Sequence, residues 1–172
     1  MVLGRRALLA LSLLFLGAST QGCLYSFRGG TFPPHIRTIA IVPFENTTTR
    51  LELTQELHTV LLRSLPRSLG IRVAGEDVAD AVVRGRITVY DVSTPNYRAD
   101  PTGDRAEVLQ RQVTIGVTVE ILDLVNNEIL WEDSAMRGEG QYLEASEAEE
   151  VGKQLAIDLL VQRIVDGAQS NW

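Results

Sequence analysis

The residues of this chain with the clearest chemical potential are one cysteine and a pair of arginines. Cys23 is the only cysteine, and a thiol near the start of a mature chain can carry a covalently attached lipid. Arg84 and Arg86 are two positions apart, so on a strand both side chains point to the same face. Guanidinium groups bind phosphate and carboxylate groups in a forked geometry. These residue types and spacings therefore indicate lipid attachment and contact with anions.

Patterns typical of enzymes and metal sites are missing from the sequence. It has no glycine-rich dinucleotide loop, Walker lysine motif, zinc-peptidase helix motif or serine-hydrolase elbow. The two histidines, His35 and His58, stand apart from each other, and we expect each to be structural or solvated and not catalytic. The carboxylates between Glu144 and Glu150 fall at the start of a predicted helix, where the helix dipole favours negative charge. We therefore predict no enzymatic activity, no metal and no cofactor.

The amino-acid composition also limits which class of protein this is. The chain has 172 residues, of which 45% are hydrophobic, and it carries 22 acidic against 16 basic side chains. A chain of this size can bury a single core without disulfides or metals. Proteins that bind nucleic acid need a basic surface to neutralise phosphates, and this acidic balance argues against such a partner.

The first 22 residues read as an export signal. Arg5 and Arg6 precede an apolar run from Ala7 to Ala18, and small and polar residues follow. The run is too short for a membrane-spanning helix, which needs about 20 apolar residues. We expect residues 1–22 to be a cleaved signal peptide of the lipoprotein type and residues 23–172 to form one periplasmic domain.

Cys23 follows Gly22 directly, and this junction resembles the lipobox of bacterial lipoproteins. The resemblance implies that Cys23 becomes the mature N-terminus and carries S-diacylglycerol and N-acyl groups, which anchor the protein to a membrane. Leu24 follows, in place of the aspartate that retains such lipoproteins in the inner membrane, so we expect the outer membrane. The alternative is ordinary cleavage near Ala18 or Ser19, which would leave a free thiol.

Hydrophobic periodicity predicts both strands and helices in the mature chain. Residues 112–121 alternate strictly between apolar and polar side chains, as in a strand with one buried face. Thr49 with Glu52, and Ser146 with Glu149, have the spacing of capping boxes at helix starts. We expect strands over residues 25–27, 35–44, 71–73, 83–92, 112–121 and 128–131, and helices over residues 50–65 and 147–168.

Prolines and asparagines mark the predicted breaks between these elements. Pro66 predicts a stop or kink in the first helix because proline removes a helical hydrogen bond. Pro95–Asp104 reads as a polar loop, and Asn126–Asn127 as a hairpin turn. Asp77–Ala81 is compatible with either a turn or a short helical turn.

The predicted buried and exposed faces of one strand and of the last helix indicate how the layers pack. On the strand at 83–92 we expect Val83, Gly85, Ile87 and Val89 to be buried, and Arg84, Arg86, Thr88 and Tyr90 to be open. On the last helix we expect a polar stripe at Glu150, Gln154, Asp158, Gln162 and Asp166, with Val151, Leu155, Leu159, Leu160 and Ile164 docked on the sheet.

These elements predict an α+β fold, a two-layer sandwich of a mixed, largely antiparallel sheet of about five strands with two helices packed on one face. The other sheet face is left uncovered, and it is either simply solvated or a binding surface. If it binds, the candidate contact residues are Arg84 and Arg86 on the strand and, in the adjoining loop, Tyr97, Arg98 and Arg105.

Several segments, taken in order, resemble the LPS-assembly lipoprotein family LptE. They are the start Cys23–Gly29, the run Ile39–Asn46, the step Ala79–Gly85 into a strand, and Leu122–Asp123 followed by Ile129–Trp131. The resemblance implies an outer-membrane lipoprotein on the periplasmic face that plugs the LptD β-barrel and assists its assembly, with lipopolysaccharide as a further candidate ligand of the arginines. A second resemblance, carried by Ile39–Phe44, is to CsgG-like, TolB N-terminal-like and LpoB-like envelope lipoproteins, which are also not enzymes.

Overall fold

The computed structural model describes residues 32–99 and 106–170, with the backbone alone over 95–99 and 106–109. Cys23, Arg105 and the strand expected at 25–27 lie outside the described residues.

One mixed sheet and two helices make up the fold. The strand order is β3-β1-β4-β5-β6, and β2 also pairs with β4. β1 runs parallel to β3 and β4, whereas β4, β5 and β6 form an antiparallel meander. The elements are β1 (Thr38–Ile41), β2 (Glu45–Asn46), α2 (Leu53–Leu69), β3 (Arg72–Val73), the 3-10 turn η1 (Glu76–Val78), β4 (Ala81–Ala99), β5 (Ala106–Asp123), β6 (Glu128–Tyr142) and α3 (Glu149–Ser170).

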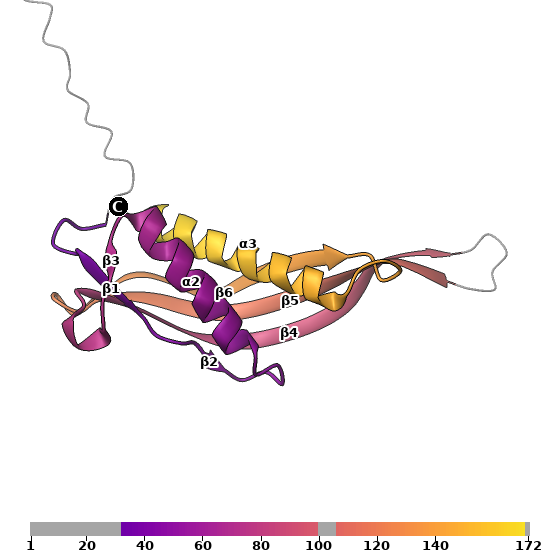
Figure 1. Cartoon of the computed structure of the whole chain (residues 1–172), viewed down its shortest axis with the longest axis horizontal. Helices are drawn as coiled ribbons and strands as arrows, with labels where there is room; N and C mark the ends of the chain where they lie inside the picture. The colour runs from indigo at the N-terminus through magenta and orange to yellow at the C-terminus, as the bar shows by residue number, and fades with distance from the viewer. Residues whose placement is uncertain (1–31, 100–105, 171–172) are drawn as a thin grey trace, which may run out of the picture.

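The two helices lie side by side on the same face of the sheet (Figure 1). This arrangement confirms the predicted two-layer α+β sandwich. The core lies between the layers and is built from alternate residues of the strands and one side of each helix. Its fully buried side chains include Ile39, Leu57, Leu61, Ile87, Ile115, Ile121, Ile157, Leu160 and Ile164.

The alternation predicted for β4 is right only as far as Ile87. The pairing with β5 shifts between Ile87 and Val89, which marks a bulge. A bulge inserts one residue and exchanges the faces beyond it. Tyr90 and Val92 therefore pack against the core, and Val89 pairs with Gly116 on the open face, contrary to the prediction.

The β4–β5 hairpin is longer than the sequence predicts. The loop expected from Pro95 is strand up to Ala99, and β5 already begins at Ala106. A further shift in pairing lies between Ser93 and Asn96, next to Pro95. Proline is tolerated in a sheet at such irregularities, because there its missing N–H does not break the ladder.

Pro66 neither stops α2 nor ends its packing. The helix continues to Leu69, with Leu65 and Pro66 buried. Its end is set by Gly70, whose left-handed backbone (φ 68°) lets its N–H and that of Ile71 both donate to the carbonyl of Pro66. The capping box at Thr49 is also wrong, because Glu52 occupies the N-cap and makes no side-chain cap.

Helix α3 approaches β6 closely enough to require glycine. A Cβ on Gly138 would overlap the carbonyl oxygen of Ala156, and one on Gly140 would overlap that of Gly152. This close approach buries the side of α3 that carries Ala156, Leu160 and Ile164 and leaves Val151 and Leu155 exposed. The polar stripe was predicted correctly, but Val151 and Leu155 do not dock on the sheet.

Candidate functional site

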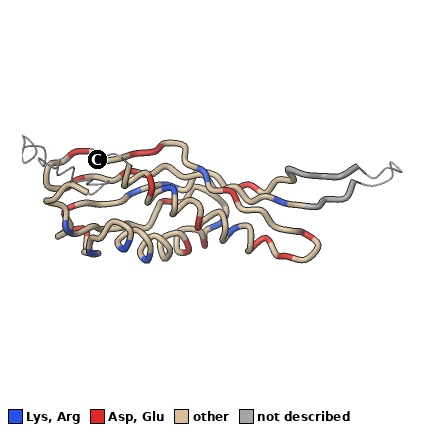
Figure 2. Tube along the Cα trace, turned by 90° about the horizontal axis from the view of Figure 1, so that it is seen from above, with Lys and Arg blue, Asp and Glu red and all other residues tan. Residues whose placement is uncertain are grey.

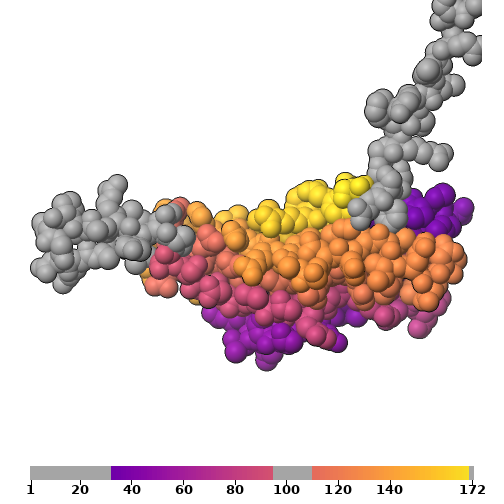
Figure 3. Space-filling model, turned by 180° about the vertical axis from the view of Figure 1, so that it is seen from behind, coloured from indigo at the N-terminus to yellow at the C-terminus, as the bar shows by residue number. Residues whose placement is uncertain are grey.

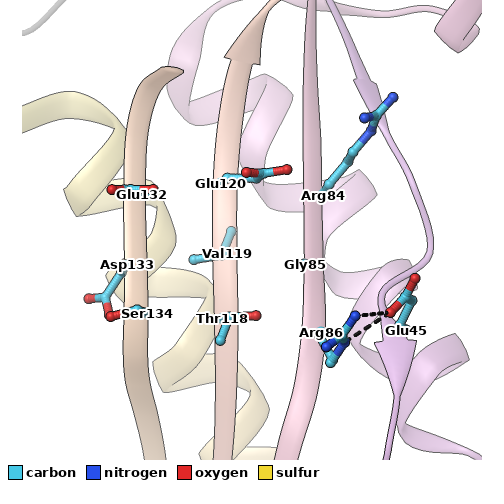
Figure 4. Close-up of a pocket in the computed structure, with 10 residues that line it drawn as sticks. All are labelled: Glu45, Arg84, Gly85, Arg86, Thr118, Val119, Glu120, Glu132, Asp133 and Ser134. Atoms are coloured by element: carbon cyan, nitrogen blue, oxygen red, sulfur yellow. Dashed lines mark hydrogen bonds and ion pairs between the residues drawn. The ribbon is translucent and has the colours of Figure 1, made fainter. Parts of the chain in front are cut away.

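The face of the sheet opposite the helices carries a shallow hollow of about 400 Å³. It runs across β2, β4, β5 and β6 (Figure 4). No helix among the described residues covers it. The residues that line it are Glu45, Arg84, Gly85, Arg86, Thr118, Val119, Glu120, Glu132, Asp133 and Ser134.

Both predicted arginines lie in this hollow, and each is paired with a glutamate. Arg86 donates to Oε2 of Glu45 from Nε at 2.9 Å and from a terminal nitrogen at 2.7 Å. Arg84 forms an ion pair with Glu76 and extends away from Glu120, its cross-strand neighbour (Figure 4). Both guanidinium groups are thus already in contact with carboxylates.

Glu120 and Glu132 lie opposite each other on β5 and β6. Among the described residues neither forms an ion pair or a hydrogen bond that would neutralise it. The lining therefore holds four carboxylates and two guanidiniums. Along the described chain, basic residues are dispersed among acidic ones and form no continuous basic stretch (Figure 2).

Tyr97 and Arg98, two of the other predicted contact residues, are not part of the lining of the hollow. They fall in the outer part of β4, where their backbones pair with Val108 and Glu107 of β5. The structure describes no side chains there. Arg105 lies outside the described residues, so its predicted role stays a prediction.

His35 has a structural environment, as we expected. Its Nε2 lies 2.6 Å from Oδ2 of Asp123, a fully buried carboxylate at the β5–β6 turn. Asp123 also accepts the N–H groups of Val125 and Asn126. Burial raises the pKa of Asp123, but the hydrogen bonds from Asn126, His35 and Val125 outweigh burial and hold it below its ordinary value.

Asp80 ties the start of β4 to β1. Its Oδ2 accepts hydrogen bonds from the N–H of Arg37, the N–H of Thr38 and the hydroxyl of Thr38. These bonds, that from Arg37 first, lower the pKa of Asp80. The Ala79–Asp80 segment that leads into β4 thus has a structural role, because these hydrogen bonds hold it against the start of β1.

Polar contacts also join the two helices to each other and α3 to the sheet. Lys153, nearly buried on α3, lies 2.9 Å from both Glu56 of α2 and Glu150. Burial lowers the pKa of Lys153, but the two carboxylates outweigh it and raise the pKa above its ordinary value. The hydroxyl of Tyr90 on β4 donates a hydrogen bond to Glu149 of α3 at 2.6 Å. The guanidinium of Arg50 lies over the Tyr90 ring, 5.0 Å from its centroid. These contacts fix the helices and leave the opposite face free.

Sequence reasoning missed the carboxylates of the hollow. Glu120 was placed on the polar face by alternation, but its partner in register, Glu132, could be found only from the pairing of β5 with β6. Glu45 looked like a loop residue, and it reaches the hollow because β2 pairs with β4 beside Arg86.

Within residues 32–99 and 106–170, no cluster of three or more histidine, cysteine or acidic side chains is arranged to hold a metal ion. No helix in the same part of the chain is both long and apolar enough to cross a membrane.

Comparison with known families now decides the class of the protein. The model of the LptE family, described as lipopolysaccharide-assembly, matches residues 36–167, which include every strand described here, all of α2 and all of α3 except residues 168–170. The chain belongs to the LptE family. This is a lipopolysaccharide-assembly family of lipoproteins without enzymatic activity, and the expected resemblance is confirmed. A search among curated proteins finds no match.

Solved structures share the fold of this LptE-family chain at low sequence identity. The dodecamer of a PelC point variant from Paraburkholderia phytofirmans aligns with a TM-score of 0.50 and 18% identity, over 83% of this chain and 95% of the other. The hypothetical protein CT253 from Chlamydia trachomatis aligns with a TM-score of 0.53 and 12% identity, over 77% and 98% of the two chains. These similarities support the fold alone.

Proposed function

We propose that this LptE-family protein is an outer-membrane lipoprotein, anchored at Cys23 on the periplasmic face, that plugs an LptD-like β-barrel and assists its assembly. It catalyses no reaction. The observation that carries the proposal is the family match over nearly all described elements. It is supported by a sheet with one face that no helix of residues 32–99 and 106–170 covers, which offers a broad surface to a barrel wall.

The open face is the proposed contact surface. Arg84 and Arg86 contribute to it through guanidinium groups that are paired with Glu76 and Glu45. The helical layer lies on the other side of the sheet formed by β4, β5 and β6 (Figure 1). The family match is to LptE, which favours this function over the envelope-lipoprotein alternative of the CsgG, TolB and LpoB type.

The test is co-purification from the native host. Full-length protein extracted from membranes in mild detergent should carry a large outer-membrane barrel, and the complex should dissociate on heating in electrophoresis. The Cys23→Ala variant should lose lipid labelling and fall in abundance in the outer membrane. A chain that purifies alone from outer membranes, or with cell-wall synthases, would contradict the proposal.

A further inference from the structure

The open face holds two carboxylates that no described cation neutralises, because Arg84, the register partner of Glu120 on β4, extends away to Glu76 (Figure 4). Glu120 and Glu132 are register partners on adjacent antiparallel strands. Like charges placed directly opposite each other on one face of a sheet destabilise the pairing. A cationic group placed between them would remove this repulsion.

The same hollow shows which cation its carboxylates accept. Oε2 of Glu45 receives both Nε and a terminal nitrogen of Arg86, at 2.9 Å and 2.7 Å. Two N–H donors of one guanidinium thus converge on a single carboxylate, with the directional fit that distinguishes arginine from other cations. Thr118 and Ser134 line the hollow beside the two glutamates and add hydroxyl groups that can accept further N–H donors.

Other occupants fit this surface less well. The lining carries four carboxylates against two guanidiniums, both already held by glutamates, so the local field opposes phosphate groups. No set of three or more metal-ligating side chains is found among the described residues. Charge complementarity therefore favours a protein surface that carries cationic side chains.

We infer that the hollow around Glu120 and Glu132 is a docking surface for arginine side chains of a partner protein. The inference deepens the proposed function and rests on it only for the identity of that partner, which would present the arginines on its inner wall. Electrostatic contacts of this kind fix orientation and the rate of association more than raw affinity. The carboxylates would then set how the chain is oriented against its partner.

A short peptide of six arginines is the direct probe, titrated into the full-length chain in detergent at low salt. We expect the E120Q/E132Q variant to bind the peptide about fivefold more weakly than the original chain, from two exposed charge pairs. The control variant E52Q/D158Q removes the same charge from the helical layer and should bind like the original. Equal binding by all three proteins, or equal loss in both variants, would overturn the inference.

A second probe distinguishes phosphate from guanidinium as the ligand. Vesicles containing lipopolysaccharide should not bind through the hollow, so R84Q/R86Q should leave vesicle binding unchanged. A loss of vesicle binding confined to R84Q/R86Q would show that the hollow takes phosphates, and would overturn the inference. Neither probe needs the barrel, so failure to co-purify a barrel would count against the proposed function alone.

Discussion

The imidazole Nε2 of His35 lies 2.6 Å from the buried Oδ2 of Asp123, 88 positions further along the chain. This contact joins the segment that enters β1 to the β5–β6 turn. Asn126 completes the cluster, since its amide nitrogen lies 2.9 Å from the same carboxylate oxygen. The cluster therefore holds the segment before β1 and the β5–β6 turn together at one end of the sheet.

Removing the Asp123 carboxylate should destabilise the fold. Asp123→Ala leaves the N–H groups of Val125 and Asn126 without their acceptor, and we expect the free energy of unfolding to fall by about 2–3 kcal/mol. Urea denaturation followed by circular dichroism measures the change. Glu128→Ala, at an exposed position of the same hairpin, is the control and should change stability by less than about 0.5 kcal/mol. Similar losses in both variants would contradict the role given to Asp123.

Acid should unfold the protein through the two hydrogen-bonded aspartates. Asp80 and Asp123 both have pKa values below the ordinary 3.8 in the folded state. A lowered pKa contributes stability above the unfolded value, and that contribution is lost as the pH falls through the folded-state pKa.

We therefore expect the free energy of unfolding to decrease as the pH falls below about 4. In Asp80→Asn the decrease should be shallower. Denaturation curves at a series of pH values from 6 to 2 test this, and a stability that rises on acidification would be incompatible with the hydrogen bonds described.

The contact of α3 with β6 depends on glycine. Gly138→Ala places a methyl group against the carbonyl oxygen of Ala156, so the helix must move away from the strand. Overpacking of this kind costs about 1–3 kcal/mol. Gly75→Ala is the matched control, because a Cβ at Gly75 meets nothing within 4 Å. If thermal unfolding midpoints drop equally in both variants, the close approach is not what limits stability.

Glu120→Gln should stabilise the isolated chain. It removes one charge from the Glu120–Glu132 pair, whereas Arg84, the register partner of Glu120 on β4, is already paired with Glu76. We therefore expect a gain of a few tenths of a kcal/mol at low salt. The gain should shrink as salt screens the repulsion. Chemical denaturation at two ionic strengths measures both effects. A loss of stability that is independent of salt would show that Glu120 supports the fold itself.

The sequence was sufficient to predict the layers of this fold. The alternation in residues 112–121 gave the buried face of β5 because side chains of a strand repeat every second residue. The turn at Asn126–Asn127 was also predicted correctly, and Asn127 has the positive φ of 55° that asparagine tolerates. These features depend on local chemistry, and local chemistry can be read directly from the chain.

Features that depend on long-range geometry were not predictable. The bulge after Ile87 turns Tyr90 toward α3, where it meets Glu149, and no local pattern marks that insertion. Val151 and Leu155 have the spacing of a buried stripe, but the glycines of β6 bring a different side of α3 to the sheet. Strand register likewise decides that Glu120 meets Glu132.

The edge strand β6 and the α3 helix beside it are seen from behind in Figure 3. In this view α3 (yellow) lies along one margin of the molecule, and the strands (orange to magenta) form much of the visible surface. Ser134 marks the open face, and Asp158 on α3 marks the other side. Both are exposed.

The most direct measurement is photo-crosslinking in living cells, with a photoreactive phenylalanine at Ser134 or at Asp158 of the full-length chain. The account predicts a crosslink from Ser134 to the inner wall of a large outer-membrane barrel, with the crosslinked barrel peptide rich in arginine. The Asp158 position should give a weaker product or none. Crosslinks from Asp158 alone, or from Ser134 to proteins other than a barrel, would contradict the claim that the open sheet face is the docking surface.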